Sequence, residues 1–224
     1  MPDLNITSLS ISGYGGNPVP NRFFRQEGAA RTLAVLFPGL RYSCDMPLLY
    51  YPLKLLLERG AEVLQVRADY SLPAYQSLLP SERAAWLAVD AEAVVQAART
   101  QGEYTRLVLI GKSIGTVALA SLVPHAREAI TIWLTPLLRN PQLVAGCAAA
   151  EQNRGAALFI AGTADDLYDA AALDRIRAAT QAEALLVEGG DHSLEIAGDF
   201  LASLRALEQV MQAIGGFLDR QGVL

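Results

Sequence analysis

One serine stands in a pentapeptide that is typical of a nucleophile turn. Ser113 is the central residue of GKSIG (111–115), which follows the apolar run 107–110 and precedes a helix-like segment. In a strand, turn and helix of this kind, the glycines remove Cβ atoms that would clash where the chain reverses, and the serine Oγ is exposed above the sheet. A neutral hydroxyl is a weak nucleophile, so chemistry at Ser113 needs a base and a group that orients the base.

The base has to be one of two histidines. His125 lies at the end of the expected helix that follows Ser113, from where it cannot easily fold back to the sheet edge, so we interpret it as a surface residue. His192 lies in EGGDHSLE (188–195), after the last expected strand and before the last expected helix. A loop in that place can bring His192 beside Ser113.

The carboxylate follows the penultimate expected strand, in AGTADDLYD (161–169). Gly162 ends that strand, and the third residue beyond it, Asp165, can point back across the strand tips, whereas Asp166 points elsewhere. Adjacent aspartates on one turn do not flank a substrate bond as the paired carboxylates of a glycosidase do. Two neighbouring aspartates and one distant histidine also lack a metal-ligand spacing, so we expect neither a metal nor a cofactor.

Strands and helices alternate from residue 31 to the end of the chain, which predicts an α/β fold. We expect a three-layer, doubly wound, mainly parallel sheet, preceded by an antiparallel hairpin at the sheet edge over residues 1–28. The whole chain, 1–224, is expected to form a single domain without a large cap. In such sheets ligands bind beyond the carboxyl ends of the strands, where the three residues above lie. The expected strands are 31–37, 61–66, 107–110, 130–134, 156–161 and 184–187, and the expected helices are 45–58 with Asp45 as N-cap, 81–99, the segment after 115 to about 123, 139–150, 169–180 and 194–218.

Composition narrows the class of partner. The chain has 224 residues and a formal net charge of −5, with no run of lysines or arginines, so we expect neither a nucleic-acid nor a membrane partner but a small molecule. The first residues lack an apolar core of signal-peptide length, and no stretch is long enough to span a membrane, which predicts a cytoplasmic protein. Cys44 and Cys147 are too few for a disulfide framework. The oligomeric state stays open.

Four motifs together resemble those of a known superfamily. They are FPGLRYSCDMP (37–47), GKSIGT (111–116), GTADD (162–166) and GGDHSLE (189–195). In this order, and each at a strand end, they resemble the α/β-hydrolase superfamily, in which serine, aspartate and histidine follow one another along the chain. The chain is similar to the small serine hydrolases of that superfamily that lack a cap, over residues 31 to about 218.

This resemblance implies a role for each site residue. Ser113 would be the nucleophile, His192 the general base and acid, and Asp165 the group that orients His192. The backbone N–H groups of Leu40 and Ile114 would form the oxyanion hole. Where the superfamily often has His-Gly before the oxyanion residue, this chain has Phe-Pro-Gly, so the histidine's supporting hydrogen bonds are absent.

Four further side chains are expected near a substrate pocket. Tyr42 and Tyr70 stand in loops after strands, and Cys44 stands near the oxyanion loop at a helix N-terminus, where a lowered thiol pKa would make it a second nucleophile. We favour packing or pocket lining for Cys44. Lys112 is either a solvent-exposed neighbour of Ser113, which we favour, or a contact for an acidic substrate group. A phosphate-binding loop is disfavoured because Arg106 stands where its first glycine belongs.

The favoured function is a serine hydrolase that cleaves a small carboxylic ester or thioester through an acyl-enzyme intermediate. An acyltransferase on the same triad remains an alternative, since the triad does not decide which nucleophile takes the acyl group. A weakly catalytic small-molecule binding protein of the same fold is the second alternative. The chain between 134 and Asp165 has no long insertion, which favours a short acyl chain over a lipase with a large lid.

Overall fold

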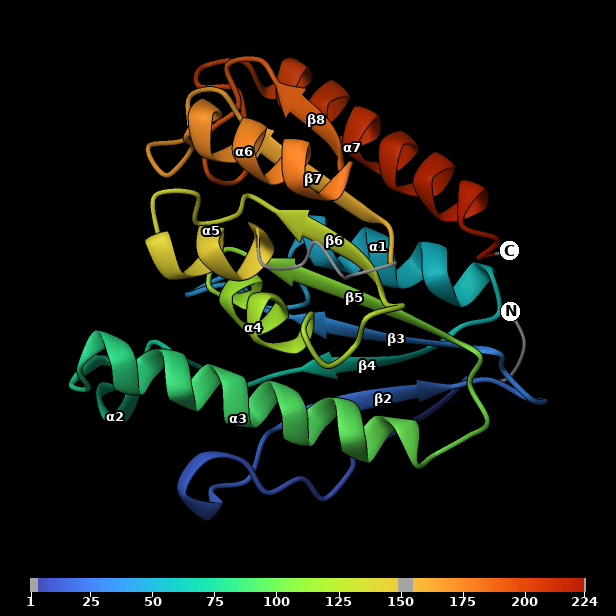
Figure 1. Ribbon diagram of the computed structural model, residues 1–224. Helices are drawn as coiled ribbons and strands as arrows, with labels where there is room; N and C mark the ends of the chain where they lie inside the picture. Colours follow the sequence, from blue (N-terminus) through green and yellow to red (C-terminus); the bar gives the residue numbers. More distant parts are fainter. Residues whose placement is uncertain (1–3, 149–154, 224) are drawn as a thin grey trace.

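The computed structural model describes residues 4–148 and 155–223, which form three layers (Figure 1). Within these residues lies an eight-stranded sheet with the order β1-β2-β4-β3-β5-β6-β7-β8. Every pairing from β4 to β8 is parallel, and the pairings of β2 with β1 and β4 are antiparallel. The predicted mainly parallel α/β fold is confirmed. The strands are β1 Asn5–Thr7, β2 Asn21–Arg25, β3 Thr32–Phe37, β4 Glu62–Val66, β5 Arg106–Lys112, β6 Ile130–Leu134, β7 Ala157–Gly162 and β8 Glu183–Val187.

Helices cover both faces of the sheet because its central strands are apolar on both sides. All residues of β3 and β6 are buried. On one face α1 and α7 pack, and on the other α3, α4, α5 and α6 pack. The helices are α1 Pro47–Glu58, α2 Pro73–Gln76, α3 Pro80–Arg99, α4 Gly115–Leu122, α5 Pro141–Ala148, α6 Ala170–Thr180 and α7 Phe200–Arg220, with a 3-10 turn, η1, at Tyr14–Gly16. None of the helices in the described ranges is long and apolar enough to cross a membrane.

The N-terminal hairpin is built into the sheet and is not only an edge addition. Strand β2 pairs with β4, and its residues Phe23 and Phe24 are buried in the two faces of the core. Only β1 lies at the edge, and all its residues are exposed. The hairpin therefore closes one side of the hydrophobic core.

Three helix starts differ from the expectation, and one of them is that of α5, which begins at Pro141 and not at 139. Helix α1 begins without a side-chain cap, because Asp45 turns away to pair with Arg67 at 2.8 Å. Helix α7 begins at Phe200 and not at 194, since Asp199 caps it by accepting a hydrogen bond from Ala202 N. The last two residues of the helix expected over 139–150 lie outside the described residues.

Candidate active site

The turn that carries Ser113 is shaped by two backbone contacts that only glycine permits. A Cβ at Gly115 would lie 2.5 Å from the carbonyl oxygen of Phe37, and one at Gly111 would lie 2.5 Å from the carbonyl oxygen of Gly115. Ser113 itself has a φ of 54°, in the left-handed region that a residue with a Cβ seldom adopts. The turn therefore presses α4 against the end of β3 and holds Ser113 at the carboxyl edge of the sheet.

A continuous chain of hydrogen bonds joins the three expected side chains. His192 Nε2 lies 2.8 Å from Ser113 Oγ, and His192 Nδ1 lies 2.7 Å from Asp165 Oδ2. The other carboxylate oxygen of Asp165 accepts a hydrogen bond from Leu167 N at 2.8 Å. Because an ionised carboxylate only accepts, Nδ1 carries the proton, and Nε2 is left to accept from the serine hydroxyl. The Asp165 side chain is 2% exposed and that of His192 33%, so the imidazole is the more open of the pair.

The loops that carry Asp165 and His192 are bonded to each other. Ala164 N donates to the carbonyl oxygen of Gly190 at 3.0 Å, and Gly189 N donates to Thr163 Oγ1 at 2.8 Å. A Cβ at Gly162 would lie 2.0 Å from the carbonyl oxygen of Gly190. The turns after β7 and β8 thus form one unit, which fixes the distance between the carboxylate and the imidazole.

The His192 loop has its own internal support. Asp191 Oδ1 accepts from Ser193 N at 2.7 Å and from Glu195 N at 3.0 Å, and Asp191 N donates back to the Glu195 carbonyl oxygen at 3.0 Å. Short polar side chains commonly hold turns in this way. The turn that carries His192 is therefore held by hydrogen bonds that do not involve Ser113.

A tight turn after β3 faces the serine. Gly39 N donates to the Tyr42 carbonyl oxygen at 2.9 Å and Tyr42 N to the Gly39 carbonyl oxygen at 3.3 Å, which leaves Leu40 and Arg41 at the tip. Neither the Leu40 N–H nor the Ile114 N–H donates a hydrogen bond to another residue of the described part of the chain. Two unpaired amides beside Ser113 meet a requirement of an oxyanion hole.

A cavity of about 530 Å³ opens beside Ser113 and His192. Its other lining residues are Leu40, Ile114, Leu137, Arg139, Asn140 and Leu167. Sequence reasoning missed four of these residues, all from the loops after β6 and β7, namely Leu137, Arg139, Asn140 and Leu167. The sequence shows which loops follow the carboxyl ends of the strands and so reach the site. It does not show the conformation of each loop, which decides which side chain faces the cavity.

The four side chains expected at the pocket lie elsewhere. Tyr42, Cys44, Tyr70 and Lys112 are 7%, 1%, 5% and 2% exposed, and none lines the cavity beside Ser113. Burial raises the pKa of the Cys44 thiol to about 12, the opposite of the lowered pKa considered above. Lys112 is not solvent-exposed either, because it is the last residue of β5 and its side chain faces the interior.

Tyr70 belongs to an aromatic cluster on the other side of the Ser113 turn. Its ring packs against Tyr75, and its hydroxyl donates to Asp90 Oδ2 at 3.3 Å. Partly buried Ile114 packs against this cluster through its side chain. Tyr70 thus supports the wall behind the turn and does not face the cavity.

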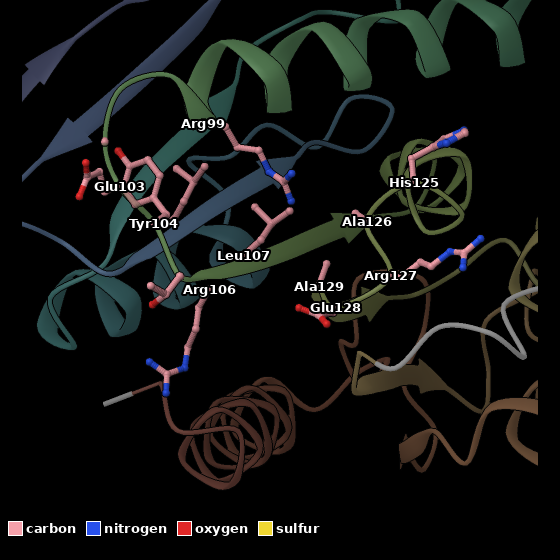
Figure 2. Close-up of a pocket in the computed structure, with 13 residues that line it drawn as sticks. Arg99, Glu103, Tyr104, Arg106, Leu107, His125, Ala126, Arg127, Glu128 and Ala129 are labelled. Carbon is pink, nitrogen blue, oxygen red and sulfur yellow. The ribbon is translucent and has the colours of Figure 1, made fainter.

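A second cavity, of about 570 Å³, lies at the opposite edge of the sheet, at the amino ends of β3, β5 and β6. It contains His125, exposed as expected. In Figure 2 the charged side chains diverge, with Arg106 extending away from His125 and Arg127. In residues 4–148 and 155–223 no three His, Cys, Asp or Glu side chains are grouped so that they could hold a metal ion. The candidate active site is at Ser113, where the hydrogen-bond chain meets the cavity of about 530 Å³.

Solved structures share the fold of this chain over nearly its whole length. A serine hydrolase without a lid from Xanthomonas campestris superposes with a TM-score of 0.71 at 16% identity, covering 96% of this chain and 94% of its own. The chain has the α/β-hydrolase fold. No family model matches the sequence, and no curated protein matches it significantly.

Two esterases have the same α/β-hydrolase fold. Est1E from Butyrivibrio proteoclasticus, solved with ferulic acid bound, gives a TM-score of 0.73 at 14% identity and covers 96% of this chain and 100% of its own. An esterase from Pyrococcus furiosus gives 0.70 at 12% identity, with 97% and 93% covered. At such identities the likeness establishes the fold, and the chemistry has to be argued from the site.

Proposed function

We propose that this protein hydrolyses a small carboxylic ester or thioester through an acyl-enzyme intermediate on Ser113. The observation that carries the proposal is the hydrogen-bond chain from Asp165 through His192 to Ser113, at the mouth of a largely apolar cavity. The esterases and the serine hydrolase of the same fold support this reaction class. Residues that hold a proton acceptor 2.8 Å from a serine hydroxyl have the arrangement needed for nucleophilic acyl transfer.

In the acylation step, Ser113 Oγ attacks the ester carbonyl carbon as its proton passes to His192 Nε2. The carbonyl π electrons move to the oxygen, which becomes an oxyanion that accepts hydrogen bonds from the Leu40 and Ile114 amides. Asp165 holds the Nδ1 proton and stabilises the imidazolium. When the tetrahedral intermediate collapses, the bond to the leaving alcohol or thiol breaks, and His192 Nε2 returns the proton to that group.

In the deacylation step, water takes the place of the alcohol. His192 removes one proton from water, the oxygen attacks the acyl carbon, and the Ser113 Oγ–carbon bond breaks as Oγ regains a proton. The products are a carboxylic acid and the free serine. If an alcohol or amine attacked in place of water, the same site would act as an acyltransferase, so product analysis with added alcohol separates the two activities.

The test compares the parent protein with Ser113→Ala on p-nitrophenyl acetate and butyrate, and on laurate for chain length. We expect the variant to lose essentially all turnover, because removing the nucleophile alone costs about as much as removing the whole triad. A fluorophosphonate should label the parent and not the variant. The short esters should be preferred, since the described connection from β6 to β7 consists of α5 and adjoining loops, which form no large lid.

The matched control is Ser121→Ala, a serine of α4 whose Oγ donates to the Ala118 carbonyl oxygen away from the cavity. It should label and turn over like the parent. Full activity in Ser113→Ala would refute the proposal. A parent that neither labels nor shows an acylation burst, yet binds a small metabolite, would favour the binding-protein alternative.

A further inference from the structure

The residue before the nucleophile is a buried lysine. Lys112 is one of two lysines in the chain, and only 2% of its surface is exposed. Successive residues of β5 point to opposite faces of the sheet, so the Lys112 side chain lies on the same face as those of Val108 and Ile110. Both of these belong to the core under α1 and α7. The cavity beside Ser113 does not include it. Lys112 therefore lies behind the reaction centre and not in it.

The Lys112 side chain contacts both end residues, Gly39 and Tyr42, of the turn that has Leu40 at its tip. The aliphatic stem packs on Gly39, where an added Cβ would lie 2.9 Å from Lys112 Cδ. The ammonium nitrogen lies 4.6 Å from the centroid of the Tyr42 ring, within the range of a cation–π interaction. Gly39 and Tyr42 are the two residues whose backbone hydrogen bonds close the turn. A single side chain thus supports the whole turn from the core side.

The ammonium has no ion-pair partner in the described part of the chain. The charged and titratable groups that face it are Tyr42 from the turn after β3, Asp165 from the loop after β7, and Asp191 from the loop after β8, with Glu195 beyond Tyr42. Because Lys112 is only 2% exposed, water screens its charge much less than it screens a surface charge, so the ammonium keeps much of its electric field.

We propose that Lys112 is a positioning residue for the oxyanion hole. Its ammonium fixes the Gly39–Tyr42 turn through the Tyr42 ring, so that the Leu40 N–H points at the place where the oxyanion forms. Its positive charge also favours the negative charge that develops there. The inference rests on the proposed hydrolase function and adds to it a residue outside the triad.

The proposal gives activity a dependence on pH. Burial lowers the pKa of Lys112 to about 8, although Asp165 and Asp191 oppose the shift. Burial also raises the pKa of Tyr42 to about 12, so the ring hydroxyl stays neutral in this range. When the pH rises through about 8, Lys112 loses its proton, and the cation–π contact and the field are lost with it. We therefore expect kcat to fall on the alkaline side as this proton leaves.

The experiment measures kcat and KM on p-nitrophenyl butyrate, over a pH series that brackets 8, for the parent, Lys112→Met and Lys112→Arg. Loss of one oxyanion donor costs about 10²–10³ in rate, and a donor that is only displaced costs less, so we expect kcat of Lys112→Met to fall roughly 10-fold. KM should change little, and the alkaline decline near pH 8 should disappear. Lys112→Arg keeps a charge that does not titrate, so it should lose the decline while retaining more of the activity.

Two controls make the result specific. Lys54→Met removes the other lysine, on α1, and should leave both kcat and the pH profile unchanged. Tyr42→Phe keeps the ring but removes the hydroxyl that accepts from Leu48 N, whereas Tyr42→Leu removes the ring that receives the ammonium. Only Tyr42→Leu should therefore lower kcat, and because Lys112 still titrates in it, its alkaline decline should remain.

An unchanged kcat and pH profile in Lys112→Met would overturn the inference alone, provided that the parent labels at Ser113 and turns over the ester. If Lys112→Met fails to fold, an alkaline decline that persists in Lys112→Arg would overturn it equally. A parent with neither labelling nor turnover would refute the proposed function and this inference together.

Discussion

Asp165→Asn tests the orientation of the base most sharply, because the structure limits how the new amide can sit. Asp165 Oδ1 accepts from Leu167 N, and only the carboxamide oxygen of asparagine can replace it there. The amide NH₂ then faces His192 Nδ1, which has to become an acceptor. The proton moves to Nε2, so Nε2 no longer accepts the Ser113 hydroxyl proton.

The expected magnitude follows from the alternative orientation. If the asparagine amide rotates by 180°, its oxygen again accepts from His192 Nδ1 and the original tautomer is restored. Its NH₂ group then faces the Leu167 N–H, so two donors meet, and an unpaired buried donor costs about 1–3 kcal/mol. That penalty alone makes the productive orientation of the amide roughly 5- to 150-fold less populated than the unproductive one. With the carboxylate's stabilisation of the imidazolium also lost, we expect kcat to fall by about 10⁴, which is about 5.5 kcal/mol of barrier.

The assay is kcat on p-nitrophenyl butyrate, with Asp166→Asn as the matched control, because Asp166 is the exposed neighbour in the same turn. Asp166→Asn should match the parent, and both variants should keep the parental thermal midpoint within a few degrees. An Asp165→Asn protein within tenfold of the parental kcat would refute the reasoning. So would an equal loss in both variants.

Two predictions concern stability. Gly162→Ala should lower the free energy of unfolding in urea by about 1–3 kcal/mol, and kcat as well, because its Cβ would displace the Gly190 carbonyl oxygen that joins the two loops. In the control, Gly215→Ala, the Cβ meets no atom closer than 3.6 Å, so neither stability nor kcat should fall. Burial raises the pKa of Asp90, which accepts from Tyr14 N and Trp86 Nε1. A raised carboxyl pKa adds stability that is lost as the pH rises through it, so the free energy of unfolding of the parent, relative to Asp90→Asn, should be lower at pH 7 than at about pH 4. An equal or opposite difference in urea titrations would contradict this.

The sheet was predictable because each central strand is an apolar run closed by glycine, proline or a polar loop. Once β3, β5, β6, β7 and β8 are parallel neighbours, their carboxyl ends meet at one edge, and the loops that carry Ser113, Asp165 and His192 are brought to that edge. The chain has only two histidines, and the position of His125 after the expected helix left His192 as the one candidate for the base. Helix α3 was harder, because Val89 fits an apolar stripe and is exposed, whereas polar Asp90 is buried by its contacts with the η1 turn.

Lys112 shows why the rest of the site was not predictable. Strand alternation points its side chain to the same side as Ile110, but lysine is rarely buried, and that general rule favours a solvent-exposed residue. The rule fails here because Gly39 leaves room for the stem and the Tyr42 ring receives the ammonium. Both residues come from a turn 70 or more positions earlier in the chain, and their closeness exists only after β3 and β5 pair. The burial of such a residue is decided by tertiary contacts, so it cannot be predicted from the residues next to it in the sequence.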